Sequence, residues 1–302
     1  MQFAKGTLWE RIVRTTEHAK AAGALLPIPT EYTFVEDKGI RFFVRVLASL
    51  SRKDDAWKRQ KQQEAAGRKV NPFLPPEKDL TVAEISETHL AVLNKFNVME
   101  RHLLLITRAF EDQDLLLTLA DFEALWTCMA EYDALGFYNG GREAGASQQH
   151  RHLQVVPLPL APEGPSVPIE PLLVNASHAG LGSIPGFPFL HSFIRLNSTA
   201  LHKPKEAAQE TYGLYASMLA AVDMTPPAAN GLTRQSRPYC FLVTRNWMLL
   251  IPRSQEFFNG ISFNSLAFAG SLFVRNREQL DRLISFGPLN ALKSVAVEKN
   301  PY

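Results

Sequence analysis

Hydrophobic residues recur along the chain with two different periods, and each period predicts a different kind of element. Spacings of three and four residues indicate amphipathic helices, whereas alternation at every second residue indicates strands. The longer period predicts helices over residues 7–22, 114–132, 205–222 and 277–297. The alternating period predicts strands over residues 31–50, turning at 37–39, over 89–96 and 101–108, and as a hairpin over 241–254.

The stretches between these elements are polar or interrupted by proline and glycine. Residues 51–70 are highly charged and predict a solvated loop or helix. The sequence NPFLPPE at 71–77 predicts a rigid, extended connection, and residues 157–192 predict a long irregular one. Strands and helices interleave without regular βαβ units. This order favours an α+β fold with a largely antiparallel sheet and flanking helices.

Composition narrows the class of protein. The 302 residues are 46% hydrophobic and 21% charged, as expected for a folded globular protein, and the net charge of +2 does not predict a nucleic-acid partner. No apolar run is long enough to span a membrane, and the first twenty residues contain no apolar core of signal-peptide length. Cys128 and Cys240 are too far apart to suggest a zinc ribbon. We therefore expect a cytoplasmic protein with no membrane partner.

The candidate chemistry is concentrated in NGGREAGASQQHRHLQVVPLP, residues 139–159. On a strand, His150, His152 and Gln154 would share one face. The opposite face would carry Arg151, Leu153 and Val155. Because Leu153 and Val155 can be buried, the polar triplet should line a cleft. Small residues precede it, namely Gly140, Gly141, Gly145 and Ser147. They would let backbone N–H groups approach an anion, and a neutral imidazole beside such donors suits attack on phosphorus.

Two other interpretations of this stretch stay open from the residues alone. Two histidines at alternate positions could begin a zinc or iron site, although no third ligand stands out nearby. The stretch could also be a polar strand without chemistry, because glycine turns before strands are common. The combination of glycine loop and histidine pair is the more specific signal.

The segment His150–Gln154, HRHLQ, resembles the histidine-triad superfamily motif in its H-x-H-x-Q form, which marks the nucleotidyl-transferring branch, whereas the hydrolases carry a third histidine. Longer blocks resemble the diadenosine tetraphosphate phosphorylase (ATP adenylyltransferase) family: NPFLPPE, LNKFNVMERHLLLIT, NGGREAGASQQHRHLQ, WMLLIPR and FNSLAFAGSLFVR. The resemblance implies an architecture like that of galactose-1-phosphate uridylyltransferase. Residues 1–160 would form an N-terminal part and 161–302 a C-terminal part, packed as one globular unit.

The resemblance also implies a two-step reaction. His152 would attack the α-phosphorus of the dinucleotide, form an adenylyl-histidine and release ATP, and inorganic phosphate would then take the adenylyl group to give ADP. His150 would orient the nucleophile. Gln154 would hydrogen-bond the phosphoryl oxygens but cannot shuttle a proton.

Positions that match the family's substrate contacts lie on both sides of the motif. They are Lys53, Asn94, Lys95, Asn139, Gly145, Ala146, Ser147, Gln148, Gln154, Asn264, Ser265, Leu266, Ser271 and Arg275. Ser271 and Arg275 stand where the family pattern has Met and Lys, so the resemblance does not carry over the family's side-chain contacts there, although Arg275 keeps the charge. From the residues alone, Asn94 could instead be a turn residue and Lys53 an exposed lysine without a role.

The expected partners are a dinucleoside polyphosphate, ATP, ADP and phosphate. No tightly bound cofactor is expected, and Mg²⁺ or another divalent cation would only accompany the nucleotide phosphates. One alternative is a hexose-1-phosphate uridylyltransferase, which usually has prolines where Arg151 and Leu153 stand. Another is a dinucleotide-binding sensor without turnover, although the presence of His152 disfavours it.

Overall fold

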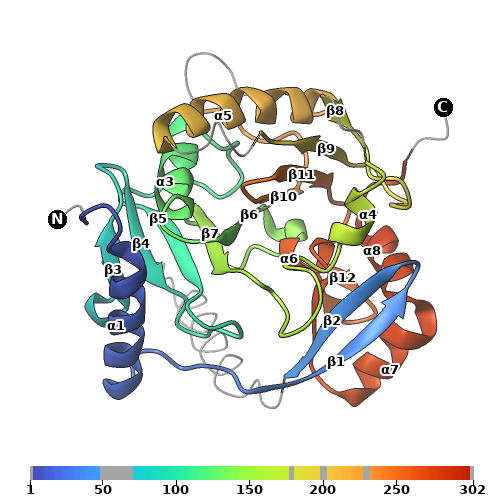
Figure 1. The fold of residues 1–302 in the computed structure, drawn as a ribbon, viewed down its shortest axis with the longest axis horizontal. Helices are drawn as coiled ribbons and strands as arrows, with labels where there is room; N and C mark the ends of the chain where they lie inside the picture. The colour runs from blue at the N-terminus through green and yellow to red at the C-terminus, as the bar shows by residue number, and fades with distance from the viewer. Residues whose placement is uncertain (1–2, 48–70, 177–179, 198–202, 227–231, 300–302) are drawn as a thin grey trace, which may run out of the picture.

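A nine-stranded sheet forms the centre of the computed structural model, which describes residues 3–47, 71–176, 180–197, 203–226 and 232–299 (Figure 1). Its strands are β3 (Thr81–Glu84), β4 (His89–Leu93), β5 (Leu103–Thr107), β6 (Ala134–Gly140), β7 (His152–Pro157), β8 (Leu181–Gly182), β9 (Ser192–Arg195), β10 (Tyr239–Val243) and β11 (Trp247–Pro252). The order is β3-β4-β5-β7-β6-β10-β11-β9-β8, and every neighbouring pair is antiparallel. The expected large antiparallel sheet is therefore confirmed.

Two smaller sheets lie beside the central one. The first contains β1 (Thr30–Asp37), β2 (Ile40–Leu47) and β14 (Ser271–Val274). β1 and β2 form the predicted hairpin, turning through Lys38 and Gly39, which both have positive φ angles. β14 pairs with β2 in parallel, so this sheet joins segments from the N-terminal and C-terminal parts of the chain. The second sheet pairs β12 (Phe257–Phe258) with β13 (Ile261–Ser262).

Helices flank the sheets. They are α1 (Leu8–Ala21), α3 (Leu119–Met129), α4 (Glu170–Leu173), α5 (Pro204–Ala220), α6 (Ser265–Phe268), α7 (Arg277–Phe286) and α8 (Pro288–Val295), with the 3₁₀ turns η1 (Lys78–Leu80) and η2 (Arg142–Ala144). In Figure 1, α3 and α5 lie together along one side of the central sheet, and α7 and α8 lie beside β1 and β2. None of the helices in the described ranges is long and apolar enough to cross a membrane.

The central sheet separates two hydrophobic cores, and the alternation of β7 fits this division. Leu153 and Val155 belong to the core that contains the buried residues of α3 and α5. His152 and Gln154, with the other orientation, pair with Ile106 and Leu104 of β5. Those two β5 residues belong to a small apolar cluster around Phe73, on the opposite face. The predicted segregation of polar and apolar residues along this strand is confirmed.

Three local predictions need correction. The final helix is two helices, because Gly287 adopts a positive φ angle and Pro288 then starts α8. The segment 71–77 contains a turn closed by the Leu74 N–H and the Asn71 carbonyl, and is not simply extended. Further elements are additional to the predicted ones: β6 lies in a stretch expected to be loop, α4 and β8 lie within the connection over 157–192 expected to be irregular, and β3, β9, β12, β13, β14 and α6 lie elsewhere.

The charged stretch 51–70, with Lys53, lies outside the described residues. The division at residue 160 stays a prediction, and the central sheet takes strands from both sides of it.

Candidate functional site

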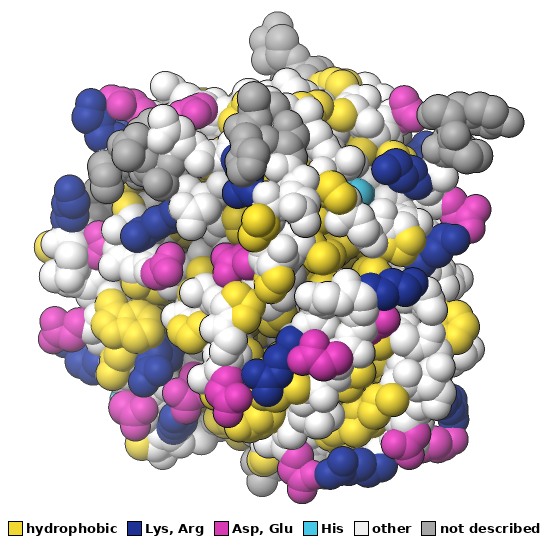
Figure 2. Space-filling view, turned by 45° about the vertical axis from the view of Figure 1, so that its right-hand side comes forward, with side chains coloured by type: hydrophobic (Ala, Val, Ile, Leu, Met, Phe, Trp, Pro, Cys, Tyr) yellow, Lys and Arg dark blue, Asp and Glu magenta, His cyan; other side chains and the backbone are white. Residues whose placement is uncertain are grey.

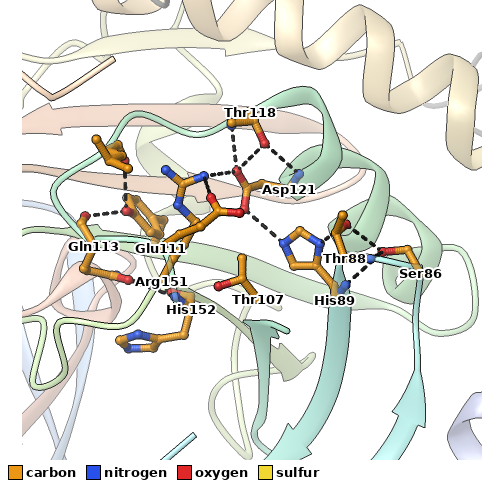
Figure 3. Close-up of polar contacts among 12 residues, drawn as sticks. Ser86, Thr88, His89, Thr107, Glu111, Gln113, Thr118, Asp121, Arg151 and His152 are labelled. Carbon is orange, nitrogen blue, oxygen red and sulfur yellow. Dashed lines mark hydrogen bonds and ion pairs between the residues drawn. The ribbon is translucent and has the colours of Figure 1, made fainter. Parts of the chain in front are cut away.

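The strands β6 and β7 separate where the histidine motif begins. Phe137 of β6 pairs with Gln154 of β7, but two residues further along each strand, Asn139 and His152 are bridged by the Gln113 side chain instead. Gln113 accepts from the His152 N–H at 2.8 Å and donates to the Asn139 carbonyl at 2.9 Å and the His152 carbonyl at 3.3 Å (Figure 3). The inserted amide satisfies backbone groups that the ladder leaves unpaired and fixes the start of β7.

The His152 side chain is held with one nitrogen available. Its Nδ1 lies 2.8 Å from the His150 carbonyl oxygen, and because a carbonyl can only accept, Nδ1 carries the proton. Nε2 therefore keeps its lone pair. Burial lowers the pKa of His152 to about 4, and only 4% of the residue is exposed. The imidazole is consequently neutral at physiological pH, as a nucleophile must be.

His150 lies just before β7 and is fixed from both sides. Its Nε2 donates to the Thr107 carbonyl at 2.8 Å, and its Nδ1 accepts from the Asn71 amide at 2.9 Å. The Asn71 amide is itself oriented, because its Oδ1 accepts from the Phe73 N–H at 3.0 Å. Burial lowers the pKa of His150 as well. This neutral histidine positions its own carbonyl against His152.

Arg151 points to the opposite side, where it is completely buried with Asp121 (Figure 3). Its Nη1 lies 3.0 Å from Asp121 Oδ2 and 2.8 Å from Glu111 Oε2. Asp121 also accepts from His89 and caps α3 through Thr118. Burial raises the pKa of the Asp121 carboxyl, but the His89 hydrogen bond and the Arg151 charge outweigh it and bring the pKa down to about 2. This network anchors the motif to α3.

Gln154 is oriented by His102, the residue directly before the neighbouring strand β5. Its Oε1 lies 2.9 Å from Nε2 of His102, and Nδ1 of His102 lies 3.3 Å from the amide nitrogen of Asn94. Asn94 therefore lies two hydrogen bonds away from Gln154. The structure thus brings together four of the residues expected at the site: His150, His152, Gln154 and Asn94.

The glycine-bearing loop that precedes the histidine motif contacts the segment that begins α6. Asn139 Oδ1 accepts from the Ser265 N–H at 2.9 Å and from its hydroxyl at 2.7 Å. At Gly145, with φ +94°, an added Cβ would lie 2.8 Å from Asn264 Cβ and 3.1 Å from its Cα. The N–H groups of Gly145 and Ala146 donate to carbonyls within their own loop, so these two groups are already used and do not face an anion. The next N–H along the chain is that of Ser147.

Arg253 lies behind these two loops, with 2% of its surface exposed. Its guanidinium donates to the carbonyls of Phe263, at 3.0 Å, and Ala144, at 3.5 Å, the residues just before Asn264 and Gly145. It also donates to the Gln255 and Val295 carbonyls. No ion pair of Arg253 with an acidic residue is found in the described part of the chain. Its positive charge therefore favours an anion at the loops.

The remaining predicted contacts are more dispersed. Lys95 is paired with Glu77 at 2.7 Å, and Ser271 is buried and accepts from Arg45 at 2.8 Å. The backbone of Arg275 is held by Gln279. Ser147 is exposed, Gln148 is half-buried, and Leu266 is buried in the core beside Ser265. Their roles as substrate contacts stay predictions.

Three residues of the site were not singled out from the sequence: Asn71, His102 and Gln113. Arg253 ends the family-like block WMLLIPR, where the residues alone allow either a surface partner or a phosphate contact, and the structure shows that it is buried. Asn71 and His102 do lie inside the family-like blocks NPFLPPE and LNKFNVMERHLLLIT, which gave a weak signal. Gln113 precedes α3 in an unremarkable polar stretch. Only the folded arrangement shows that its amide reaches His152.

The described surface and side-chain clusters add two observations. In Figure 2, Lys and Arg side chains are intermixed with Asp and Glu over the visible face. Within the described ranges, no group of three or more His, Cys, Asp or Glu side chains could hold a metal ion.

Two family models match the chain. Residues 1–175 match the Ap4A phosphorylase N-terminal domain, and residues 185–298 match the ATP adenylyltransferase C-terminal domain. Two curated proteins of Saccharomyces cerevisiae are similar to it. Diadenosine 5',5'''-P1,P4-tetraphosphate phosphorylase 2 is 27% identical over 265 residues, 80% of this chain and 79% of that protein. Protein APA1 is 25% identical over 232 residues, 70% of this chain and 71% of that protein.

The fold is similar to that of yeast Ap4A phosphorylase Apa2. Its crystal structure superposes with a TM-score of 0.77 at 21% sequence identity, covering 99% of this chain and 100% of that chain. A second structure of the yeast enzyme, in complex with Ap4A, gives the same TM-score of 0.77. The α+β architecture expected from the sequence is thereby confirmed.

Proposed function

Because the chain belongs to the Ap4A phosphorylase family, we propose that it cleaves diadenosine tetraphosphate with inorganic phosphate and produces ATP and ADP. The observation that carries this proposal is the state of His152. Its Nδ1 proton is donated to the His150 carbonyl, so the lone pair lies on Nε2, for which the described residues provide no hydrogen-bond donor, and burial keeps the ring neutral by lowering its pKa to about 4.

The first half-reaction is attack of His152 Nε2 on the α-phosphorus. An N–P bond forms as the bond from phosphorus to the bridging oxygen breaks, and ATP leaves with that oxygen. A polyphosphate leaving group is a weak base, so it needs little help from a general acid. This suits Gln154, whose amide can donate a hydrogen bond but cannot transfer a proton.

In the second half-reaction, a phosphate oxygen attacks the same phosphorus. The N–P bond breaks, ADP is released, and His152 returns to its neutral form. Asn139 and the loop around Gly145 are the proposed phosphate contacts, and the buried charge of Arg253 behind that loop would favour the polyanion. The bound nucleotide would carry any divalent cation through its own phosphates.

The test compares wild type with His152→Ala on diadenosine tetraphosphate, with and without phosphate. We expect phosphate-dependent formation of equal amounts of ATP and ADP, and a drop in turnover on the order of a thousand-fold or more in the variant. Brief exposure of wild type to substrate without phosphate should leave an acid-labile AMP adduct on the protein. An alanine variant with full activity would overturn the assignment of His152.

His191→Ala is the matched control. His191 is also buried, its Nδ1 also donates to a carbonyl two residues earlier, that of Phe189, and burial also lowers its pKa to about 4. Its Nε2, however, accepts from the Ile184 N–H, so it has no free lone pair. This variant should lose stability but keep the AMP adduct. Transfer of a uridylyl group when a UDP-hexose is supplied instead would favour the uridylyltransferase alternative, and binding of the dinucleotide by wild type without turnover would favour the sensor alternative.

The cellular setting belongs to the same proposal. Cys128 and Cys240 are both free and buried, which is consistent with a reducing compartment such as the cytoplasm. The proposed partners are small nucleotides and phosphate.

A further inference from the structure

A chain of hydrogen bonds with a defined direction ends at the Gln154 amide. It begins at the Phe96 N–H, which lies 3.3 Å from Asn94 Oδ1. A backbone N–H can only donate, so the Asn94 oxygen is turned to Phe96 and its amide nitrogen to His102. The amide nitrogen can in turn only donate, at 3.3 Å, and Nδ1 of His102 is therefore the acceptor.

The tautomer of His102 follows from this contact. With Nδ1 unprotonated, the neutral ring carries its proton on Nε2, which lies 2.9 Å from Gln154 Oε1. The Gln154 carbonyl is therefore turned toward His102, and its N–H₂ group points away from that residue. Within the described part of the chain, this N–H₂ group has no hydrogen-bond partner. Gln154 is 8% exposed, so the amide is held in a largely desolvated site.

The other histidine relay at the site has the same design. The Phe73 N–H orients Asn71, Asn71 donates to Nδ1 of His150, and Nε2 of His150 donates to the Thr107 carbonyl. In both relays a backbone N–H fixes an asparagine, and the asparagine fixes a histidine tautomer. The relay through His102 differs in its end point, which is a side-chain amide next to His152 in the motif and not a backbone carbonyl.

The direction of the amide matters for phosphoryl chemistry. The non-bridging oxygens of a phosphate only accept hydrogen bonds, so the N–H₂ group of Gln154 attracts them and its carbonyl oxygen repels them. The two ends of the amide have nearly the same shape, and steric fit alone does not choose between them. A donor already aimed at the developing charge stabilises a transition state more than one that must first rotate.

We propose that His102 is a positioning residue that fixes the Gln154 amide with its N–H₂ group toward the transferred adenylyl phosphate, in an inference that rests on the proposed function. His102 does not itself touch the substrate. Asn94, expected at a ribose contact, has the additional task of setting the His102 tautomer.

The kinetic test is a double-mutant cycle with wild type, His102→Phe, Gln154→Ala and the double variant. Phenylalanine keeps the ring but removes the donor. We expect His102→Phe to lower kcat about 10-fold, the effect of one lost hydrogen bond, while KM changes little. Gln154→Ala should lower kcat further, and adding His102→Phe to it should cost nothing more, because no amide remains to be oriented. The proposal would be overturned if His102→Phe lowered kcat equally in wild type and in Gln154→Ala, or if it did not lower kcat in wild type.

A second measurement does not depend on turnover. In protein with ¹⁵N-labelled histidine, the His102 ring should show a protonated Nε2 and an unprotonated Nδ1. A proton on Nδ1 in the neutral ring would contradict the relay. His191→Phe is the stability control: it removes two buried hydrogen bonds outside the site and should lower the unfolding temperature without changing kcat.

These measurements distinguish a failure of the proposed function from a failure of the role proposed for His102. If wild type forms no ATP from diadenosine tetraphosphate and phosphate, the proposed function fails, while the tautomer still decides whether the relay exists. AMP affinity of the same four proteins, measured by calorimetry, then replaces kcat in the cycle, with the same pattern expected. If wild type is active and the cycle shows independent effects, only the role of His102 fails.

Discussion

The burial of His152 makes a quantitative prediction about the pH dependence of adenylyl transfer. With its pKa at about 4, only about 3% of the imidazole is protonated at about pH 5.5, whereas an ordinary histidine with a pKa of about 6.5 is about 90% protonated there. Lowering the pH from about 7.5 to about 5.5 should therefore reduce the first half-reaction by only a few per cent. An unperturbed nucleophile would lose about 10-fold.

The assay is a single-turnover measurement of AMP-adduct formation without added phosphate, because phosphate titrates in the same range. Circular dichroism at each pH establishes that the protein remains folded. A rate that falls to half near pH 6.5 would refute the idea that burial keeps His152 neutral.

The same shift has a consequence for stability, and its sign is defined. The folded pKa of His152 lies below the unfolded value, so the stability is complete above about pH 6.5 and is lost as the pH falls toward 4. The shift corresponds to about 3 kcal/mol below pH 4, at about 1.4 kcal/mol per pKa unit. In urea unfolding, the free energy of unfolding of His152→Asn should decrease less than that of wild type as the pH falls through this window. Equal slopes of the free energy against pH in the two proteins would contradict the prediction.

Asp121→Asn should lower the free energy of unfolding by about 3 kcal/mol, because it breaks a buried ion pair with Arg151, and a urea midpoint equal to wild type would argue against this network. The pKa of Asp121 is held at about 2, so wild type should keep this contribution above about pH 4 and lose it as the pH falls through 2. Gly145→Ala should raise KM for the dinucleotide, since the new Cβ would lie 2.8 Å from Asn264 and force the two loops apart. Gly164→Ala is its control, with the same φ of +94° and nothing within 4 Å of the added atom; equal KM values in the two variants would show that the approach of the loops is unimportant.

Much of the fold could be predicted because its elements bury one face and leave the other to different surroundings. The hairpin of β1 and β2 and the helices α1 and α3 carry this periodicity. β10 and β11 are buried throughout, and they could be predicted from two short apolar runs on either side of the polar pair Arg245–Asn246. β6 was not predicted. All seven of its residues are buried, so it has no polar face, and its Gly and Asn residues resemble a loop.

By itself, the sequence determined which residues of the motif share a face. The spacing of His150, His152 and Gln154 places them together on any strand, with Arg151 on the opposite side. It also determined the family, because the long blocks around the motif are specific. Nothing in that spacing determined which nitrogen of His152 is free.

Only the tertiary structure decided the proton positions and the electrostatics of the site. Hydrogen-bond direction depends on which donors and acceptors approach each ring, and these come from segments distant in sequence: Asn71 for His150, Asn94 and His102 for Gln154, and Gln113 for the His152 backbone. Burial, which sets the pKa of His152, is likewise a property of the packed molecule. The motif supplies the reacting groups, and the surrounding sheet sets their protonation and orientation.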